Sequence, residues 1–310
     1  MSILLVFFVY ALWSSCFPLA KLVLQWSSPV FLIGFRMLFA GILLLGILWL
    51  RKSKAFKLSI KQYIGLFLLG IFSVYLTNIC EYWGLQHLSS AKTCFIYSLS
   101  PFFAMFFSYL HFKEKLTVKK LLGIAIGFIG FIPVLSLQSG SEELFTMWRL
   151  VSLPDLAVMG AALFSVYGWI LLRVFVKQEI SPMMANGASM AFGGAVAMLH
   201  SFFLDSWNPW PVAQGSCFPF LGGVLVITVI SNMICYNLYG YMLKKFTATF
   251  LSFAGLLSPV FASLSGWILL GEKPSPVIFM STAIVLLGLW IVYQEELKQG
   301  YVKTTPSTEG

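Results

Sequence analysis

One phrase that occurs twice constrains this chain more than any other feature of its sequence. Residues 99–115 read L-S-P-F-F-A-M-F-F-S-Y-L-H-F-K-E-K, and residues 257–273 read L-S-P-V-F-A-S-L-S-G-W-I-L-L-G-E-K. The offset of 158 positions, from Leu99 to Leu257, continues as far as Val134 and gives 11 identities over 36 positions. Because this period is about half of the chain, it predicts one duplicated unit rather than a solenoid of short repeats.

The scarcity of charged residues places the duplicated chain in a lipid bilayer. Only 10% of the 310 residues are charged and 59% are hydrophobic, whereas an average soluble domain has about 25% charged residues. A soluble protein of this size could not cover its surface with so few charges. The five cysteines show no C-x-x-C spacing and are interpreted as small buried side chains, so no disulfide, metal site or cofactor is expected.

Ten apolar runs are each long enough to cross the hydrocarbon core, which requires about 20 residues. The runs cover residues 2–24, 30–50, 62–84, 90–111, 119–137, 153–175, 182–204, 217–240, 248–270 and 276–294. The first run is too long for a signal peptide and is interpreted as a retained helix. The runs form two five-helix units, at residues 1–137 and 153–294, with a linker at 138–152 and a polar tail at 295–310.

The distribution of basic residues predicts the orientation of these helices. When both termini are placed inside, the inside loops contain 15 Lys and Arg residues and the outside loops contain three. Cytoplasmic loops carry the excess of positive charge in membrane proteins. We therefore expect cytoplasmic termini, a cytoplasmic tail and a periplasmic linker. The net charge of +9 is explained by the anionic inner face of the bilayer, so no nucleic-acid partner is expected.

Each unit contains an odd number of helices, so the second unit must enter the bilayer upside down relative to the first. The predicted fold class is an all-α polytopic membrane protein, with ten transmembrane helices arranged as two inverted five-helix repeats. Inverted repeats are typical of secondary transporters, which bind their substrates near the midplane between the repeats. If each half can adopt the conformation of the other, the site opens alternately to the two sides.

The duplicated phrase places Pro101 and Pro259 about midway along the fourth and ninth runs. A proline inside a helix removes an N–H donor and clashes with the carbonyl four residues earlier. In lipid the freed carbonyl needs a partner, so the two prolines are interpreted as hinges beside a cavity, with packing kinks as the alternative. In the fifth run, Gly123-x-x-x-Gly127 favours close packing of helices within the chain, with the contact face of a homodimer as the alternative.

Several short motifs occur together with this phrase. They are Trp13-Ser14 with Pro18 and Lys21, Pro29 with Arg36, the run from Asn78 to Leu85, and L-S-P…E-K in both halves. With these motifs the chain resembles, over nearly its whole length, the drug/metabolite transporter superfamily and specifically its ten-helix EamA type. The resemblance implies a central cavity walled by helices one, three, four, six, eight and nine. The second half departs from the pattern, because it shows no Pro-then-Arg pair.

Ionisable residues inside membrane spans are rare, costly and usually functional. Glu81 is the one acidic residue well inside a predicted helix. It is interpreted as a cation ligand or proton carrier, with a carboxylate wetted at the outer interface as the alternative. Arg36 is interpreted as the ligand of a substrate carboxylate, with a structural ion pair to Glu81 as the alternative. Asn78, Asn232 and Asn237 carry amides that lipid would penalise, so we expect each to face a cavity.

Aromatic residues make up 17% of the chain. Those in the predicted cavity helices are expected to form a box that stacks planar or cationic ligands, although core packing is the alternative for each one alone. The residues are Tyr10, Trp13, Tyr75, Tyr82, Tyr97, Trp169, Tyr236 and Tyr239. The three histidines lie near helix ends and share no metal-ligand spacing, so neither a metal site nor a catalytic residue is expected.

These features predict a secondary transporter that moves a small metabolite across the bacterial inner membrane by alternating access. The sequence contains no G-x-x-x-x-G-K-[ST] phosphate loop and no assembled nucleophile–base set, so it is not expected to be an enzyme. The aromatic, amide and charged groups suit an amphipathic zwitterion. In overall character the chain is similar to the S-adenosylmethionine/S-adenosylhomocysteine carriers of obligate intracellular bacteria. The alternatives are an amino-acid or drug exporter of the same superfamily, and a membrane enzyme or receptor.

Overall fold

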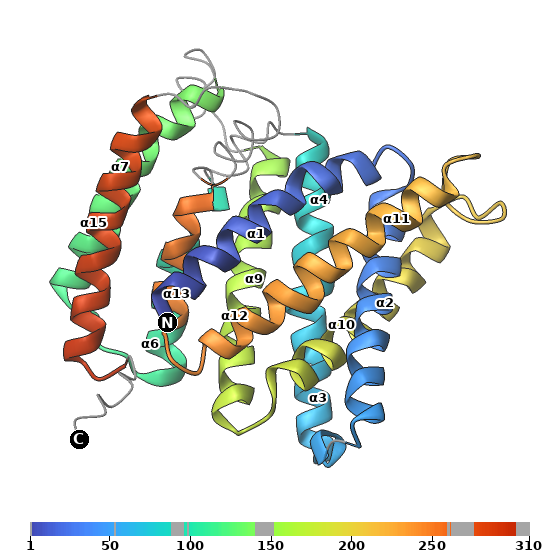
Figure 1. Cartoon of the computed structure of the whole chain (residues 1–310), viewed down its shortest axis with the longest axis horizontal. Coiled ribbons are helices and arrows are strands. Elements are labelled where there is room, and N and C mark those ends of the chain that lie inside the picture. The colour runs from blue at the N-terminus through green and yellow to red at the C-terminus, as the bar shows by residue number, and fades with distance from the viewer. Residues whose placement is uncertain are drawn as a thin grey trace.

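Helices joined by short turns make up the described part of this computed structural model (Figure 1). The structure describes residues 2–52, 54–87, 96–97, 99–139, 152–258, 261 and 276–301. Within these ranges the one strand-like pairing is an isolated bridge between Ser27 and Val212. The prediction of an all-α chain is therefore confirmed for the described residues.

The helices of the first half are α1 (Ser2–Val23), α2 (Pro29–Leu50), α3 (Ile60–Leu69), α4 (Thr77–His87), α6 (Ser100–Phe112) and α7 (Val118–Ser139). Those of the second half are α9 (Leu153–Lys177), α10 (Pro182–Leu204), α11 (Cys217–Ile227), α12 (Tyr236–Met242), α13 (Ala248–Ala254) and α15 (Pro276–Lys298). Five stretches are long and apolar enough to cross a membrane: Pro29–Leu50, Ile60–Gly84, Leu153–Lys177, Pro182–Leu204 and Cys217–Met242. By length and composition the chain is therefore a polytopic membrane protein.

Helices α2 and α10 begin with the same local signal. Ser28 caps α2 and Ser181 caps α10, and each hydroxyl accepts a 3.2 Å hydrogen bond from the backbone N–H three residues later. A proline follows each serine at the start of the helix, where its missing N–H would have no intrahelical partner. The two caps lie 153 residues apart, so corresponding helices of the two halves start in the same way.

The third helix of each half contains a π-helical turn. In the first half this turn covers Gly70–Leu76, between α3 and α4. In the second half it covers Thr228–Cys235, between α11 and α12. Such turns are rare in proteins and occur frequently at functional sites. Nothing in the apolar pattern predicts them, because an apolar run looks the same in an α-helix and in a π-helix.

The first proline of the duplicated phrase lies at the start of a helix. Pro101 does not lie midway along a helix as predicted, because α6 begins at Ser100 and Pro101 occupies its first turn. A proline suits that position, since the first N–H groups of a helix have no partner within it. In the second half the chain tightens after α13 into a 3₁₀ turn at Gly255–Leu257. Pro259 itself lies outside the described residues.

Helix α2 packs along α10 through glycines of both helices. A β-carbon built on Gly41 would lie 2.4 Å from the backbone nitrogen of Ala191, and one built on Gly194 would lie 2.3 Å from that of Leu38. Neither position has room for a side chain, so the two backbones are in direct contact. Gly41 and Gly194 lie 153 positions apart, and so do Leu38 and Ala191. Exchanging the halves therefore converts one contact into the other.

Helices α7 and α15 form a second close pair, at the left edge of Figure 1. A β-carbon built on Gly288 would lie 2.7 Å from the backbone nitrogen of Gly127, and one built on Gly130 would lie 3.2 Å from that of Val285. Gly130 and Gly288 lie 158 positions apart, and so do Gly127 and Val285, so these two contacts also exchange when the halves are swapped. Gly123 packs against the Gly288 carbonyl. Gly123 and Gly127 thus pack within the chain, and a homodimer stays a prediction.

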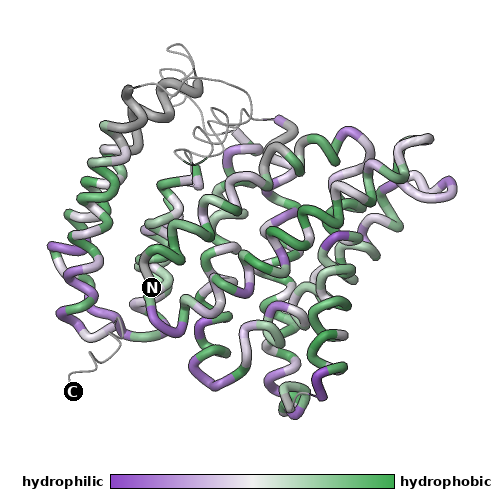
Figure 2. The backbone as a smooth tube through the Cα atoms, in the orientation of Figure 1, coloured by the Kyte–Doolittle hydropathy of each residue, from purple (hydrophilic) through white to green (hydrophobic). Residues whose placement is uncertain are grey.

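Apolar residues run along the helices, and hydrophilic residues collect near helix ends (Figure 2). The turns 51–59, 113–117, 178–181 and 243–247 all lie toward the lower side of Figure 1. These turns and the adjoining helix ends contain nearly all of the described Lys and Arg residues. The turns 24–28 and 205–216 at the opposite end contain no Lys or Arg, and the helix ends that adjoin them contain Lys21 alone. The described ends of the bundle therefore differ sharply in charge.

Candidate functional site

Arg36 is the central polar group of the candidate site. It lies on α2, only 7% exposed, and its Nη2 donates a 3.2 Å hydrogen bond to Oδ1 of Asn78 at the start of α4. Asn78 in turn donates a 2.6 Å hydrogen bond to the carbonyl of Val74 in the π-helical turn. Nε of Arg36 has no hydrogen-bond partner within the described residues. A buried guanidinium with an unused donor can bind a carboxylate.

Glu81 lies one helical turn beyond Asn78, and its carboxylate accepts a 2.8 Å hydrogen bond from the Tyr97 hydroxyl. Arg36 is close enough to act on Glu81 electrostatically. The ion pairs of the described ranges do not include an Arg36–Glu81 pair. Tyr236, from the second half, also lies within the electrostatic range of Arg36 and Glu81. The structure thus brings residues of three predicted cavity helices to one place.

Aromatic rings from α1, α9 and α12 form a cluster next to these polar groups. The ring centroids of Trp13 and Tyr236 lie 5.2 Å apart, those of Trp169 and Tyr236 also 5.2 Å, and those of Trp169 and Tyr239 4.2 Å. The Trp13 indole donates a 3.1 Å hydrogen bond to the Ser231 hydroxyl in the second π-helical turn. The rings contact one another, and Trp13 and Tyr236 are only partly buried.

Asn232 is completely buried where α2 and α10 meet the second π-helical turn. Its Nδ2 faces the sulfur atoms of Met37, at 3.0 Å, and of Met190, at 3.7 Å. Its Oδ1 has no hydrogen-bond partner in the described part of the chain. A buried polar atom without a partner is costly, so Asn232 has an unused acceptor close to the centre of the molecule.

Two other predicted residues have partners within the protein. The Tyr75 hydroxyl forms a 3.1 Å hydrogen bond with Nδ1 of His200. Asn237 accepts a 3.3 Å hydrogen bond from Asn186 and donates one of 2.9 Å to the carbonyl of Met233. Tyr82, the remaining predicted residue, is buried and lies within the electrostatic range of Arg36 and Glu81.

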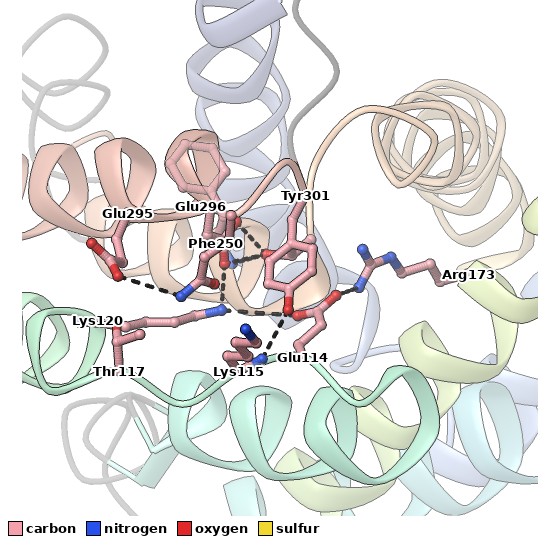
Figure 3. A network of polar contacts seen from close by, with 11 residues as sticks. Glu114, Lys115, Thr117, Lys120, Arg173, Phe250, Glu295, Glu296 and Tyr301 are labelled. Carbon is pink, nitrogen blue, oxygen red and sulfur yellow. Dashed lines mark hydrogen bonds and ion pairs between the residues drawn. The ribbon is translucent and has the colours of Figure 1, made fainter.

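A second polar cluster lies beside the turn 113–117, and the sequence patterns did not predict it (Figure 3). Lys120 and Glu296 are completely buried, and Nζ of Lys120 lies 2.7 Å from Glu296. Nζ also lies 3.8 Å from Glu114, whose other oxygen accepts from Arg173. Thr247 donates to Glu296 over 2.6 Å. The Glu114 position in the repeated phrase is the one sequence signal that marked this cluster.

Glu296 lies beyond the predicted span 276–294, in the last turn of α15. Burial raises the pKa of its carboxyl above the ordinary value, whereas the Lys120 ammonium and the hydrogen bond from Thr247 act to lower it. The cluster is close to neutral overall, because two carboxylates face two basic side chains. It therefore suits an internal connection better than the binding of a charged ligand.

The central site combines a cation, a carboxylate, side-chain amides and a cluster of aromatic rings. Such a set can hold both ends of an amino-acid group and a flat ring at the same time.

Comparison with known proteins shows the family to which this chain belongs. The profile of the EamA-like transporter family matches residues 1–136 and 152–294. The S-adenosylmethionine/S-adenosylhomocysteine transporter of Chlamydia muridarum is 41% identical over 304 residues, which cover 97% of this chain and 94% of that protein. The transporter of the same name from Chlamydia trachomatis serovar D is 40% identical over 307 residues, covering 98% and 93%.

More distant relatives agree in class and in fold. The uncharacterized inner membrane transporter YedA of Escherichia coli K12 is 27% identical over 292 residues, which cover 92% of this chain and 88% of YedA. A solved crystal structure superposes with a TM-score of 0.71 at 17% identity, covering 95% of this chain and 97% of the other. At that identity the superposition supports the fold alone.

Proposed function

The chain belongs to the EamA-like transporter family, and on this basis we propose that it moves S-adenosylmethionine across the membrane in exchange for S-adenosylhomocysteine. The observation that carries the proposal is about 40% identity, over nearly the whole of both chains, to two chlamydial transporters of that name. The two compounds differ by one methyl group and one positive charge. A site that holds the parts they share could carry one in each direction.

The protein is a multi-pass transporter of the inner membrane. We place both termini and the 295–310 tail in the cytoplasm and the 138–152 linker in the periplasm. Support comes from the described turns, because Lys and Arg gather at one end of the bundle and the turns 24–28 and 205–216 at the other end contain none.

We also propose that residues 1–137 and 153–294 are inverted repeats. Two kinds of observation support this. The glycine contacts between α2 and α10, and those between α7 and α15, occur in pairs that exchange when the halves are swapped. In addition, the third helix of each half contains a π-helical turn. A pseudo-two-fold axis that relates the halves accounts for both.

In the proposed site, Arg36 binds the substrate carboxylate and Glu81 binds the ammonium group. Asn78 and Tyr97 hold these two side chains through the hydrogen bonds described above. Trp13, Tyr82, Trp169 and Tyr236 stack on the adenine and face the sulfonium. Tyr75, Asn232 and Asn237 line the remaining wall. We propose that Pro101, in the first turn of α6, and Pro259, which lies outside the described residues, act as hinges that let the wall move.

Counterflow in proteoliposomes tests this function. Vesicles loaded with unlabelled S-adenosylhomocysteine should accumulate labelled S-adenosylmethionine, and vesicles without an internal substrate should not. Arg36→Ala and Glu81→Gln should reduce the rate at least tenfold, whereas Glu295→Gln, a change outside the site, should match the wild type. The proposed substrate is wrong if the wild type does not exchange it. Labelled amino acids or a cationic dye would then identify the exporter alternative.

A further inference from the structure

Helix α6 connects the substrate site to the cytoplasmic end of the protein. Just before the helix, Tyr97 donates its hydrogen bond to Glu81 in the site. The helix then runs from Ser100 to Phe112, and its 13 residues span about 20 Å at 1.5 Å per residue. Pro101 in its first turn separates it from the chain before it. A movement at the site can therefore displace the far end of α6 if the helix rotates as a rigid body.

That far end is held to α9, which belongs to the other half of the chain. Glu114, directly after α6, accepts a charge-assisted hydrogen bond from Arg173 of α9. The Arg173 guanidinium also lies 4.6 Å from the centre of the Phe112 ring, and the Lys177 ammonium lies 4.1 Å from it. Two cations and one carboxylate therefore close this junction, which we call the α6–α9 junction.

The surroundings of Glu114 permit this junction to open. Its second oxygen lies 3.8 Å from Lys120, which belongs to the same half and is also paired with Glu296 (Figure 3). If α6 leaves α9, Glu114 keeps Lys120 as a partner while Arg173 passes into cytoplasmic water. No charge is then left buried without a counter-charge, which would be the costly outcome.

We propose that the α6–α9 junction, formed by Phe112, Glu114, Arg173 and Lys177, is the latch of the cytoplasmic gate. It is closed in this structure and opens when the substrate site faces the cytoplasm. The Lys120–Glu296 pair between α7 and α15 stays joined in both states. This inference requires only a transporter, so it does not depend on the identity of the substrate.

Reversible cross-linking separates a gate from a permanent connection. In Phe112→Cys/Lys177→Cys, a cross-link across the junction by a short, disulfide-containing bis-maleimide should reduce exchange at least tenfold, and a reductant should restore it. His111→Cys/Tyr167→Cys joins the same two helices, where these rings lie 5.7 Å apart, and should behave in the same way. It provides the test if the first pair does not fold. Wild type treated with the same cross-linker gives the baseline.

Lys115→Cys/Tyr301→Cys is the matched control. These residues join the turn after α6 to the chain after α15, through a 2.9 Å hydrogen bond to the Tyr301 hydroxyl. That contact lies on the side that the proposal keeps together. Cross-linking it should therefore leave the exchange rate unchanged. Full exchange by a completely cross-linked α6–α9 pair would overturn the proposal.

A second measurement needs no substrate. Cys16 is buried beside Arg36, so its alkylation reports access of water to the site. In inside-out vesicles, Glu114→Gln should raise the rate of Cys16 modification by a membrane-impermeant maleimide several-fold, as followed by peptide mass mapping. In right-side-out vesicles the rate should stay at the wild-type value. Equal increases from both sides would mean general loosening and would contradict a cytoplasmic latch.

Discussion

The Arg36 guanidinium donates a 3.2 Å hydrogen bond to the side-chain oxygen of Asn78, joining two helices in the interior of the bundle. The amide of Asn78 is itself fixed by its bond to the Val74 carbonyl. Arg36 is therefore held by one end of its fork, and its Nε is unused in the described part of the chain. A side chain held in this way is positioned for a ligand before the ligand arrives.

Arg36→Lys should separate carboxylate binding from general stability. Lysine keeps the charge but loses the planar fork that matches a carboxylate. We expect the affinity for S-adenosylmethionine to fall about tenfold, which corresponds to about 1.4 kcal/mol. The affinity for an adenosine analogue that lacks the amino-acid carboxylate should stay near the wild-type value. Competition of both compounds against labelled substrate measures the two effects. An equal loss for both compounds would assign Arg36 to structure.

Trp169→Ala should weaken substrate binding more than Trp169→Phe does. Stacking of a base on an aromatic side chain is worth about 1–3 kcal/mol, so the alanine variant should bind substrate about 5- to 150-fold more weakly. The phenylalanine variant keeps a ring and should retain most of the affinity. Binding isotherms in detergent, recorded beside the melting temperature of each variant, make the comparison. Equal affinity of both variants would place the adenine elsewhere.

The membrane fold could be predicted from sequence because both of its determinants are local. Runs of apolar residues define spans, and the charge on each turn indicates its side. Arg36, Glu81 and Asn78 could be singled out as interior polar residues for a related reason, since a polar group within a span is costly unless it has a partner; their role as a substrate site stays a prediction. The contact of the Trp13 and Trp169 rings could not be predicted, because it depends on how α1 and α9 cross.

The pairing of Lys120 with Glu296 was also outside the reach of the sequence. Both residues lie near helix ends, where charged side chains are usually solvated, and their burial arises only when α7 and α15 pack together. The π-helical turns were missed because an apolar run looks the same in an α-helix and in a π-helix. What escaped prediction is thus tertiary packing, which periodicity does not encode.

Gly288→Ala should destabilise the protein through the α7–α15 pair. Its β-carbon would lie 2.5 Å from the Gly123 carbonyl oxygen and 2.7 Å from the Gly127 nitrogen, and backbone atoms cannot move aside as a flexible side chain can. Overpacking of this kind costs about 1–3 kcal/mol. Gly222→Ala is the matched control, because its β-carbon would meet nothing within 4 Å. Thermal unfolding in detergent should show a lower midpoint for Gly288→Ala alone.

Lys120→Met should destabilise the buried Lys120–Glu296 cluster, because it leaves the Glu296 carboxylate without its cation. Removing one partner of a buried ion pair costs about 3–5 kcal/mol. In Lys120→Met/Glu296→Gln neither charge remains, and the introduced amide oxygen can still accept from Thr247, so most of the lost stability should return. Glu295→Gln, on the same helix turn but partly exposed, should change stability by less than about 1 kcal/mol. Denaturant unfolding of the wild type, Lys120→Met, Glu296→Gln and Lys120→Met/Glu296→Gln gives a double-mutant cycle. Additive effects of the two substitutions would show that the pair is not coupled.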